Sequence, residues 1–318
     1  MTRGRLAAAA ISAVAAALGA PVAASAETVV SKVGTTMVVQ GGPGESSEMF
    51  VLYSTTENEH TVTEFANVAS AAPPDCTRFL FTVTCTGITA IRVLAGDRDD
   101  SVSLEPLGTA ESPRVPVEIF GEEGDDVVRG GTRGVTIDGG AGEDTVLGSN
   151  GDDVLLGGAD PDFLRGKGGN DRVEGGPGAD VVRGGDGDDL VQGDPGPDVL
   201  RGEGGNDLLL GGIGPDDLHG EGGNDRLFGG PGPDFLSGDG DNDLLRGDRG
   251  ADILLGGSGV DRLNARDRAR DRVIDCGKGK DPAAKRDRRR DPRPRSCGRF
   301  RWGAPSRSAA VRVAILRE

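Results

Sequence analysis

The stretch GEGGNDRLFGGPGPDFLS, residues 220–237, contains one nine-residue unit written twice. Each half has Gly at its first and fourth places, Asp at its sixth and Leu at its eighth. The fifth place differs, with Asn224 in the first half and Pro233 in the second. A fixed period of this kind predicts a stacked architecture in which each repeat contacts only its neighbours.

The same frame runs through fourteen consecutive units from Gly139 to Asn264 without an insertion or deletion. All of them have Gly first, Asp sixth and Leu or Val eighth. Asp160 and Asp241 replace the fourth-place Gly, and Asp is a residue type that tolerates a left-handed backbone. The frame also extends upstream over 121–138, where Val135 stands at a sixth place.

Each place in the unit predicts a local role. We expect Gly at the first and fourth places to supply positive φ angles in a tight turn. The three residues after the Asp are expected to form a short strand whose middle residue points inward. The fifth place holds Pro, Ala or Glu in one set of alternate units and Asn, Asp or Val in the other. One coil therefore contains eighteen residues, with two strands and two chemically distinct turns.

The sixth-place aspartates predict a cation. In stacked coils each of them lies beside the Asp eighteen residues later, and rows of buried carboxylates are costly when they are left unpaired. A hard cation between successive turns would take carboxylate oxygens from these rows and carbonyl oxygens from the turns. Many oxygen ligands at flexible geometry suit calcium better than magnesium.

The units match the G-G-x-G-x-D-x-U-x pattern of calcium-binding RTX (haemolysin-type) repeats, which occur in secreted bacterial proteins. The resemblance covers residues 121–264 and implies an all-β fold, a parallel β-roll with eighteen residues per coil and calcium ions in its turns. Turn backbone carbonyls would complete each site. The resemblance carries the calcium-binding role to Asp126, Asp144, Asp153, Asp162, Asp171, Asp180, Asp189, Asp198, Asp207, Asp216, Asp225, Asp234, Asp243, Asp252 and Asp261.

Four segments are expected. Residues 1–26 have a basic start, an apolar run and a small-residue cleavage site, which predicts a signal peptide and a secreted, extracellular protein; a membrane anchor is the alternative. Residues 27–120 are expected to be β-rich, either a cap on the roll or a separate β-sandwich. The roll should occupy residues 121–273, followed by a basic tail at 274–318. No later segment is apolar enough for a transmembrane helix.

Charge is strongly segregated along the chain. The formal net charge of −16 combines an acidic repeat region with a basic C-terminal end. The acidic region argues against nucleic-acid binding. The basic tail predicts contact with an anionic cell-surface polymer or lipid headgroups, or else it is simply solvated. Cys76 and Cys85, and Cys276 and Cys297, fit two local disulfides in an oxidising compartment, although three pairings are open.

No sequence motif for catalysis stands out. The chain contains neither H-E-x-x-H nor G-x-S-x-G, and its two histidines, His60 and His219, are far apart in the sequence. We therefore expect a non-catalytic calcium-binding protein whose repeats fold on binding calcium. An adhesion protein anchored by its basic tail is the alternative from another class. A hydrolase in residues 27–120, using His60 or Glu64, is the less favoured third.

Overall fold

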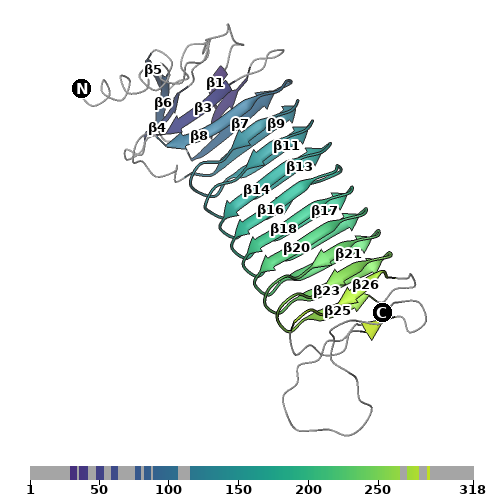
Figure 1. The fold of residues 1–318 in the computed structure, drawn as a ribbon. Helices are drawn as coiled ribbons and strands as arrows, with labels where there is room; N and C mark the ends of the chain where they lie inside the picture. The colour runs from purple at the N-terminus through teal and green to yellow at the C-terminus, as the bar shows by residue number, and fades with distance from the viewer. Residues whose placement is uncertain are drawn as a thin grey trace, which may run out of the picture.

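The structure is a computed structural model in which the regular elements are all β-strands. It describes residues 29–33, 36–41, 48–53, 59–63, 76–79, 82–86, 89–106, 115–265, 271–278 and 285–286. Successive strands stack along one axis into an elongated rod (Figure 1). The predicted signal peptide and most of the basic tail lie outside the described residues. Within the described part there is no helix that could span a membrane.

Two large sheets form the two sides of the rod. The thirteen-stranded sheet contains, in order, β1 (Val29–Val33), β2 (Thr36–Gln40), β7 (Ala90–Gly96), β9 (Val117–Glu123), β11 (Thr136–Ala141), β13 (Val154–Ala159), β15 (Arg172–Glu174), β17 (Leu190–Pro195), β19 (Leu208–Ile213), β21 (Arg226–Pro231), β23 (Leu244–Arg249), β25 (Arg262–Ala265) and β27 (Lys285–Arg286). The eleven-stranded sheet contains β26 (Val273–Asp275), β24 (Ile253–Leu255), β22 (Phe235–Ser237), β20 (Asp217–Gly222), β18 (Val199–Gly204), β16 (Val181–Asp186), β14 (Phe163–Gly168), β12 (Thr145–Leu147), β10 (Val127–Arg129), β8 (Ser101–Pro106) and β3 (Glu48–Tyr53).

The strand register confirms the eighteen-residue coil. Leu209 in β19 pairs with Val191 in β17 on one side and with Leu227 in β21 on the other, and all three strands are parallel. The chain alternates between the two sheets, so that two nine-residue units complete one turn of the solenoid. The fold is the parallel β-roll expected from the repeat.

The core is a thin ladder of eighth-place residues. Leu200 of β18 and Leu209 of β19 are fully buried, whereas their neighbours in the strands are only partly buried. This alternation places one apolar side chain per strand between the sheets, as expected for a period of two. The ladder from the first repeat to the last consists of Val128, Ile137, Val146, Leu155, Leu164, Val173, Val182, Val191, Leu200, Leu209, Leu218, Leu227, Leu236, Leu245, Leu254 and Leu263.

The turns correct one expectation. Positive φ angles occur at the second and fourth places of the units, and the first-place glycines do not have them. Asp160 (φ 78°) and Asp241 (φ 68°) do adopt the left-handed backbone expected of them at the fourth place. The first-place Gly is needed for space instead. A Cβ on Gly202 would lie within 3.0 Å of Oδ2 of Asp207 and of the carbonyl oxygen of Gly220.

Five strands that lie wholly upstream of residue 121, namely β1, β2, β3, β7 and β8, belong to the same two sheets. β7 pairs in parallel with β9, and β8 pairs in parallel with β10. Farther upstream, β2 and β3 pair in parallel with β7 and β8. The predicted boundary at residue 121 stays a prediction, but no break in the sheets marks it in the described part of the chain.

A small antiparallel sheet lies near the N-terminal end of the rod (Figure 1). It consists of β4 (Glu59–Thr63), β6 (Thr82–Thr86) and β5 (Cys76–Phe79). Cys76 and Cys85 are opposite each other in its register. At the other end of the rod, Cys276 is fully buried, while Cys297 lies outside the described residues.

Candidate functional site

The sixth-place aspartates form two rows, one at each edge of the rod. The proline-side ladder precedes strands of the eleven-stranded sheet, and the asparagine-side ladder precedes strands of the thirteen-stranded sheet. Every member is at most 3% exposed. The proline-side ladder is Asp126, Asp144, Asp162, Asp180, Asp198, Asp216, Asp234 and Asp252. The asparagine-side ladder is Asp153, Asp171, Asp189, Asp207, Asp225, Asp243 and Asp261.

Hydrogen bonds join each ladder from coil to coil in one direction. The backbone amide of Asp189 donates to Oδ1 of Asp207, eighteen residues later, at 2.8 Å. On the opposite edge the amide of Asp180 donates to Oδ1 of Asp198 at 2.9 Å. The remaining steps between ladder aspartates repeat this bond at 2.7–3.1 Å. One oxygen of each carboxylate is thereby committed to the backbone of the preceding coil.

The second carboxylate oxygen has no such use in most ladder members. Within the described residues, Oδ2 is buried and lacks a hydrogen-bond partner in Asp126, Asp144, Asp162, Asp171, Asp180, Asp189, Asp198, Asp207, Asp216, Asp225, Asp234 and Asp243. Leaving a buried acceptor unsatisfied costs about 1–3 kcal/mol, and more when the group is charged. Repetition at twelve positions indicates a missing partner common to all of them.

Burial raises the pKa of these carboxyl groups. The pKa of Asp189 is raised to about 7, chiefly by desolvation, while the amide of Asp171 opposes the shift and the charges of Asp207 and Asp171 add to it. The pKa of Asp243 is raised to about 8 by desolvation and by the nearby charges of Asp225, Asp261 and Asp241. Without a cation, the ionised ladders are therefore unfavourable at neutral pH.

Backbone carbonyl oxygens lie close to the unsatisfied carboxylates. The small space beside Gly202 is lined by Oδ2 of Asp207 and by the carbonyl oxygen of Gly220 in the next coil. The space beside Gly193 is lined in the same way by Asp198 and Gly211 on the other edge. In the described part of the chain, no group of three or more His, Cys, Asp or Glu side chains is placed to hold a metal ion. A cation in the turns must therefore combine ladder carboxylates with backbone carbonyls, which is the donor set that calcium accepts.

The structure adds two aspartates to the ladder that the sequence pattern did not predict. Asp100 and Asp271 are buried, and they continue the proline-side ladder beyond its two ends. The amide of Asp100 donates to Oδ1 of Asp126 at 2.7 Å, and the amide of Asp252 donates to Oδ1 of Asp271 at 3.2 Å. Their spacings of 26 and 19 residues break the frame. Only the partial unit AGDRDDSVS (95–103) hinted at the first of them.

The fifth place differs between the two edges in its hydrogen bonds. On the asparagine side, the amide of Asn206 donates to Oδ1 of Asp188 at 2.7 Å, and the amide of Asn224 donates to Oδ1 of Asn206 at 3.0 Å. This exposed row runs opposite to the buried ladder beside it. On the other edge, residues such as Pro197 and Pro215 have no amide hydrogen to donate. The fifth-place row is Asp152, Asn170, Asp188, Asn206, Asn224 and Asn242.

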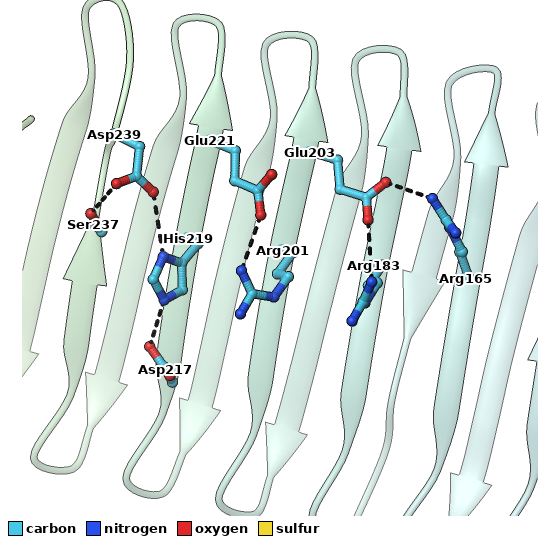
Figure 2. A network of polar contacts seen from close by, with 9 residues as sticks. All are labelled: Arg165, Arg183, Arg201, Glu203, Asp217, His219, Glu221, Ser237 and Asp239. Carbon is cyan, nitrogen blue, oxygen red and sulfur yellow. Dashed lines mark hydrogen bonds and ion pairs between the residues drawn. The ribbon is translucent and has the colours of Figure 1, made fainter. Parts of the chain in front are cut away.

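Charged side chains also connect coils on the outer face of the eleven-stranded sheet (Figure 2). Arg201 pairs with Glu221 at 3.1 Å. His219 lies between two carboxylates, with Nε2 3.1 Å from Asp217 and Nδ1 3.3 Å from Asp239. Its side chain is 22% exposed on the outer face, as its outward ninth place predicts. The side chain of His60, in β4, lies outside the described residues, as does Glu64.

Comparison with known families identifies the repeat. A family described as RTX calcium-binding nonapeptide repeat (4 copies) matches this chain at residues 120–155, 147–182, 156–191, 183–218, 201–236, 219–254 and 228–263. These overlapping segments cover the coils from Asp126 to Asp261, but neither Asp100 nor Asp271. No curated protein matches the chain.

Proposed function

We propose that this chain, in which residues 120–263 are RTX calcium-binding nonapeptide repeats folded as a β-roll, is a secreted, non-catalytic protein whose repeats fold on binding calcium. The observation that carries the proposal is the set of buried Oδ2 atoms without partners in the two ladders. The adjacent carbonyl oxygens supply the second kind of ligand that calcium requires. Secretion is supported by the sequence of residues 1–26 alone.

The proposed ligands are the carboxylates of both ladders together with turn carbonyls. Bound calcium would neutralise successive carboxylates and satisfy their second oxygens. The chain's own contribution is to hold Oδ1 in the ladder hydrogen bond, so that Oδ2 points to the same place in every turn. Asp126 belongs to this set, because its Oδ1 accepts from Asp100 while its Oδ2 has no partner among the described residues.

The cost of the ionised ladders explains why binding and folding are coupled. A carboxyl group whose pKa rises from 3.8 to about 7, as at Asp198, destabilises the metal-free fold by on the order of 4 kcal/mol at pH 8. A few such groups outweigh the roughly 5–15 kcal/mol that stabilise an ordinary domain. Calcium binding therefore supplies free energy that the metal-free coils lack.

Calcium titration of chelated protein tests the proposal. Far-UV circular dichroism at pH 8 should show a cooperative gain of β structure as calcium is added, and magnesium at the same ionic strength should not reproduce it. Magnesium is the matched control because it favours octahedral geometry and retains its waters. A spectrum that is the same with chelator, calcium and magnesium would refute calcium-dependent folding.

The adhesion alternative is favoured by one observation, the basic tail that follows the acidic roll. In this case calcium stiffens the rod and the tail contacts an anionic surface polymer. Deleting residues 278–318 should abolish retention on cells while leaving the calcium titration unchanged. Equal retention of the full and truncated chains would eliminate this alternative.

Two disulfides form part of the proposal for an exported protein. The register that places Cys76 opposite Cys85 supports the first pair. Pairing of Cys276 with Cys297 follows as the second. Non-reducing peptide mapping of exported protein should show both pairs, and any crossed pair would contradict the assignment.

A further inference from the structure

The asparagine-side ladder begins with a step unlike the others. Val135 occupies the sixth place in the coil before Asp153, and its amide donates to Oδ1 of Asp153 at 2.7 Å. The space beside Gly130 is therefore lined by the carbonyl oxygen of Gly148 and by a methyl group of Val135, where other coils have a carboxylate oxygen. This step offers one carboxylate fewer than its neighbours to a cation.

In the described structure, Asp153 also has partners that the twelve ladder members with an unsatisfied Oδ2 lack. Its Oδ2 accepts a hydrogen bond from the amide of Ser149 at 2.5 Å, and its Oδ1 accepts one from the Ser149 hydroxyl at 3.0 Å. The same hydroxyl oxygen accepts from the amide of Gly151 at 3.0 Å. Both oxygens of this buried carboxylate are therefore satisfied by its own turn.

The backbone at Ser149 is also exceptional. In thirteen of the fourteen units from Gly139 onward, the second-place residue has a positive φ angle, and Ser149 is the exception. This local change lets the Ser149 amide and hydroxyl both reach the Asp153 carboxylate. The turn from Ser149 to Asp153 therefore differs from the other turns from Gly139 onward in its backbone conformation and in its hydrogen bonds to the carboxylate.

A lysine from the next coil reaches the same turn. Nζ of Lys167 donates to the carbonyl oxygen of Gly148 at 2.5 Å, the carbonyl that lines the altered space beside Gly130. Lys167 is the only basic second-place residue in the fourteen units. It adopts a φ of 87°, in the left-handed region that is unfavourable for a non-glycine residue.

We propose that Lys167 and Ser149 replace calcium at the step from Val135 to Asp153, so that this step of the roll is complete without a metal ion. The ammonium group takes the carbonyl that a cation would otherwise use, and Ser149 satisfies the carboxylate. This inference rests on the proposed calcium-dependent folding of the other coils. Its consequence is a metal-independent start for the asparagine-side ladder.

The first test restores the ordinary repeat at this step. The double variant Val135→Asp/Lys167→Gly supplies the missing carboxylate and removes the ammonium group. Isothermal titration calorimetry of the full chain at pH 8 should show one more calcium ion per chain than in the wild type. The control Val135→Asp/Glu221→Gly carries the same new carboxylate but keeps Lys167, and it should not gain the ion.

The second test uses hydrogen exchange of the full chain in chelator. The amides of Val135 and Ser149 should exchange at least about tenfold more slowly than those of Asp189 and Asp207, because their acceptor needs no metal. Lys167→Gln should remove this difference, whereas Glu221→Gln should leave it.

The outcomes separate the inference from the proposed function. If the wild type and the Val135→Asp/Lys167→Gly variant bind equal numbers of calcium ions, or if exchange in chelator is uniform along the ladder, the inference is overturned while calcium binding stands. If neither chain binds calcium, the proposed function itself fails.

Discussion

The amide of Asp189 donates to Oδ1 of Asp207, and in the described structure Oδ2 of Asp207 accepts no hydrogen bond. One carboxylate therefore has two separate roles: its first oxygen joins the coils and its second is available to a cation. Asparagine retains the first role and loses the second. Substitutions that exploit this difference can test whether the cation or the hydrogen bond holds the coils together.

Asp189→Asn should change stability in opposite directions with and without calcium. In chelator at pH 8 the variant should be more folded than the wild type, because a buried charge is removed while the amide oxygen can still accept the ladder bond. With saturating calcium it should be less stable by about 3 kcal/mol, because a ligand is lost. Urea unfolding followed by circular dichroism measures both.

The neighbouring residue provides the matched control for this substitution. Asp188→Asn makes the same charge change one residue earlier, at an exposed position whose oxygen accepts from the amide of Asn206. It should leave the calcium dependence as in the wild type. A parallel response of the two variants would show that net charge, and not the buried ladder, controls folding.

The metal-free repeats should become more structured as the pH falls. The pKa of Asp207 is about 7 in the folded state, against 3.8 for an ordinary aspartate in the unfolded chain. Between these pH values the folded state therefore binds more protons than the unfolded state. Stability in chelator is therefore greatest near pH 4 and declines as the pH rises through 7, by at most about 1.4 kcal/mol per pH unit for each such Asp.

A pH series by circular dichroism, in chelator and in calcium, tests this dependence. The β signal in chelator should rise from pH 8 to pH 5, because a proton then neutralises carboxylates that calcium would otherwise neutralise. In saturating calcium the signal should already be high at pH 8. A β signal that falls on acidification in chelator would contradict the assignment.

Gly202→Ala and Gly204→Ala should differ sharply although they lie in one turn. A Cβ at residue 202 would collide with Oδ2 of Asp207 and the carbonyl of Gly220, whereas one at residue 204 would meet only Oδ1 of Asp186 at 3.6 Å. The first variant should lose about 1–3 kcal/mol of stability in calcium. The second should remain within about 0.5 kcal/mol of the wild type. Urea midpoints in calcium compare them, and equal losses would remove the spatial explanation for the first-place Gly.

The two edges should bind calcium with different affinity. On the asparagine side the fifth-place row already links successive turns through bonds such as the one from Asn224 to Asn206, and proline prevents such bonds at Pro197. Turns that are already connected lose less conformational freedom when a cation arrives. Calorimetry should resolve two classes of site, and a single class would disprove this difference.

The sequence was sufficient to predict the repeating part of the fold and of the site. The eighteen-residue register, the inward position of Leu209 and the alignment of the ladder aspartates all follow from one period. Each is a consequence of strand alternation and of equal coil length. Features that repeat with this period can be predicted without knowing the contacts that occur only once in the structure.

The conformational role of the glycines was not predictable in the same way. The first-place Gly never varies, which suggested a positive φ angle, but the constant requirement is room for the Asp side chain of the same unit. Positive φ angles occur instead at the fourth place, as expected, and at the second place, where Glu203, Glu221 and Asp239 adopt them despite their cost. Because the second place holds several residue types, the sequence pattern did not indicate that its backbone conformation is nearly constant.

Features that occur once were also missed. Asp100 and Asp271 join the ladder across altered spacings, because a loop can lengthen without disturbing the register of the strands on either side. The contact from Lys167 to Gly148 depends on a long side chain crossing between coils, which no local pattern encodes. Such exceptions to the repeat are visible only in the three-dimensional structure.

The one-way hydrogen bonding of the ladders makes the two ends of the rod unequal. Each ladder amide donates to the carboxylate of the coil that follows it, so the amide of Asp252 needs Asp271 as its acceptor. Removing coils from the N-terminal end would release the ladder carboxylate of the first remaining coil, together with strand amides that donate to the preceding coil, as Phe163 does to Asp144. Removing them from the C-terminal end would leave the ladder amide of the last remaining coil without its carboxylate acceptor, so each ladder is completed from its C-terminal side.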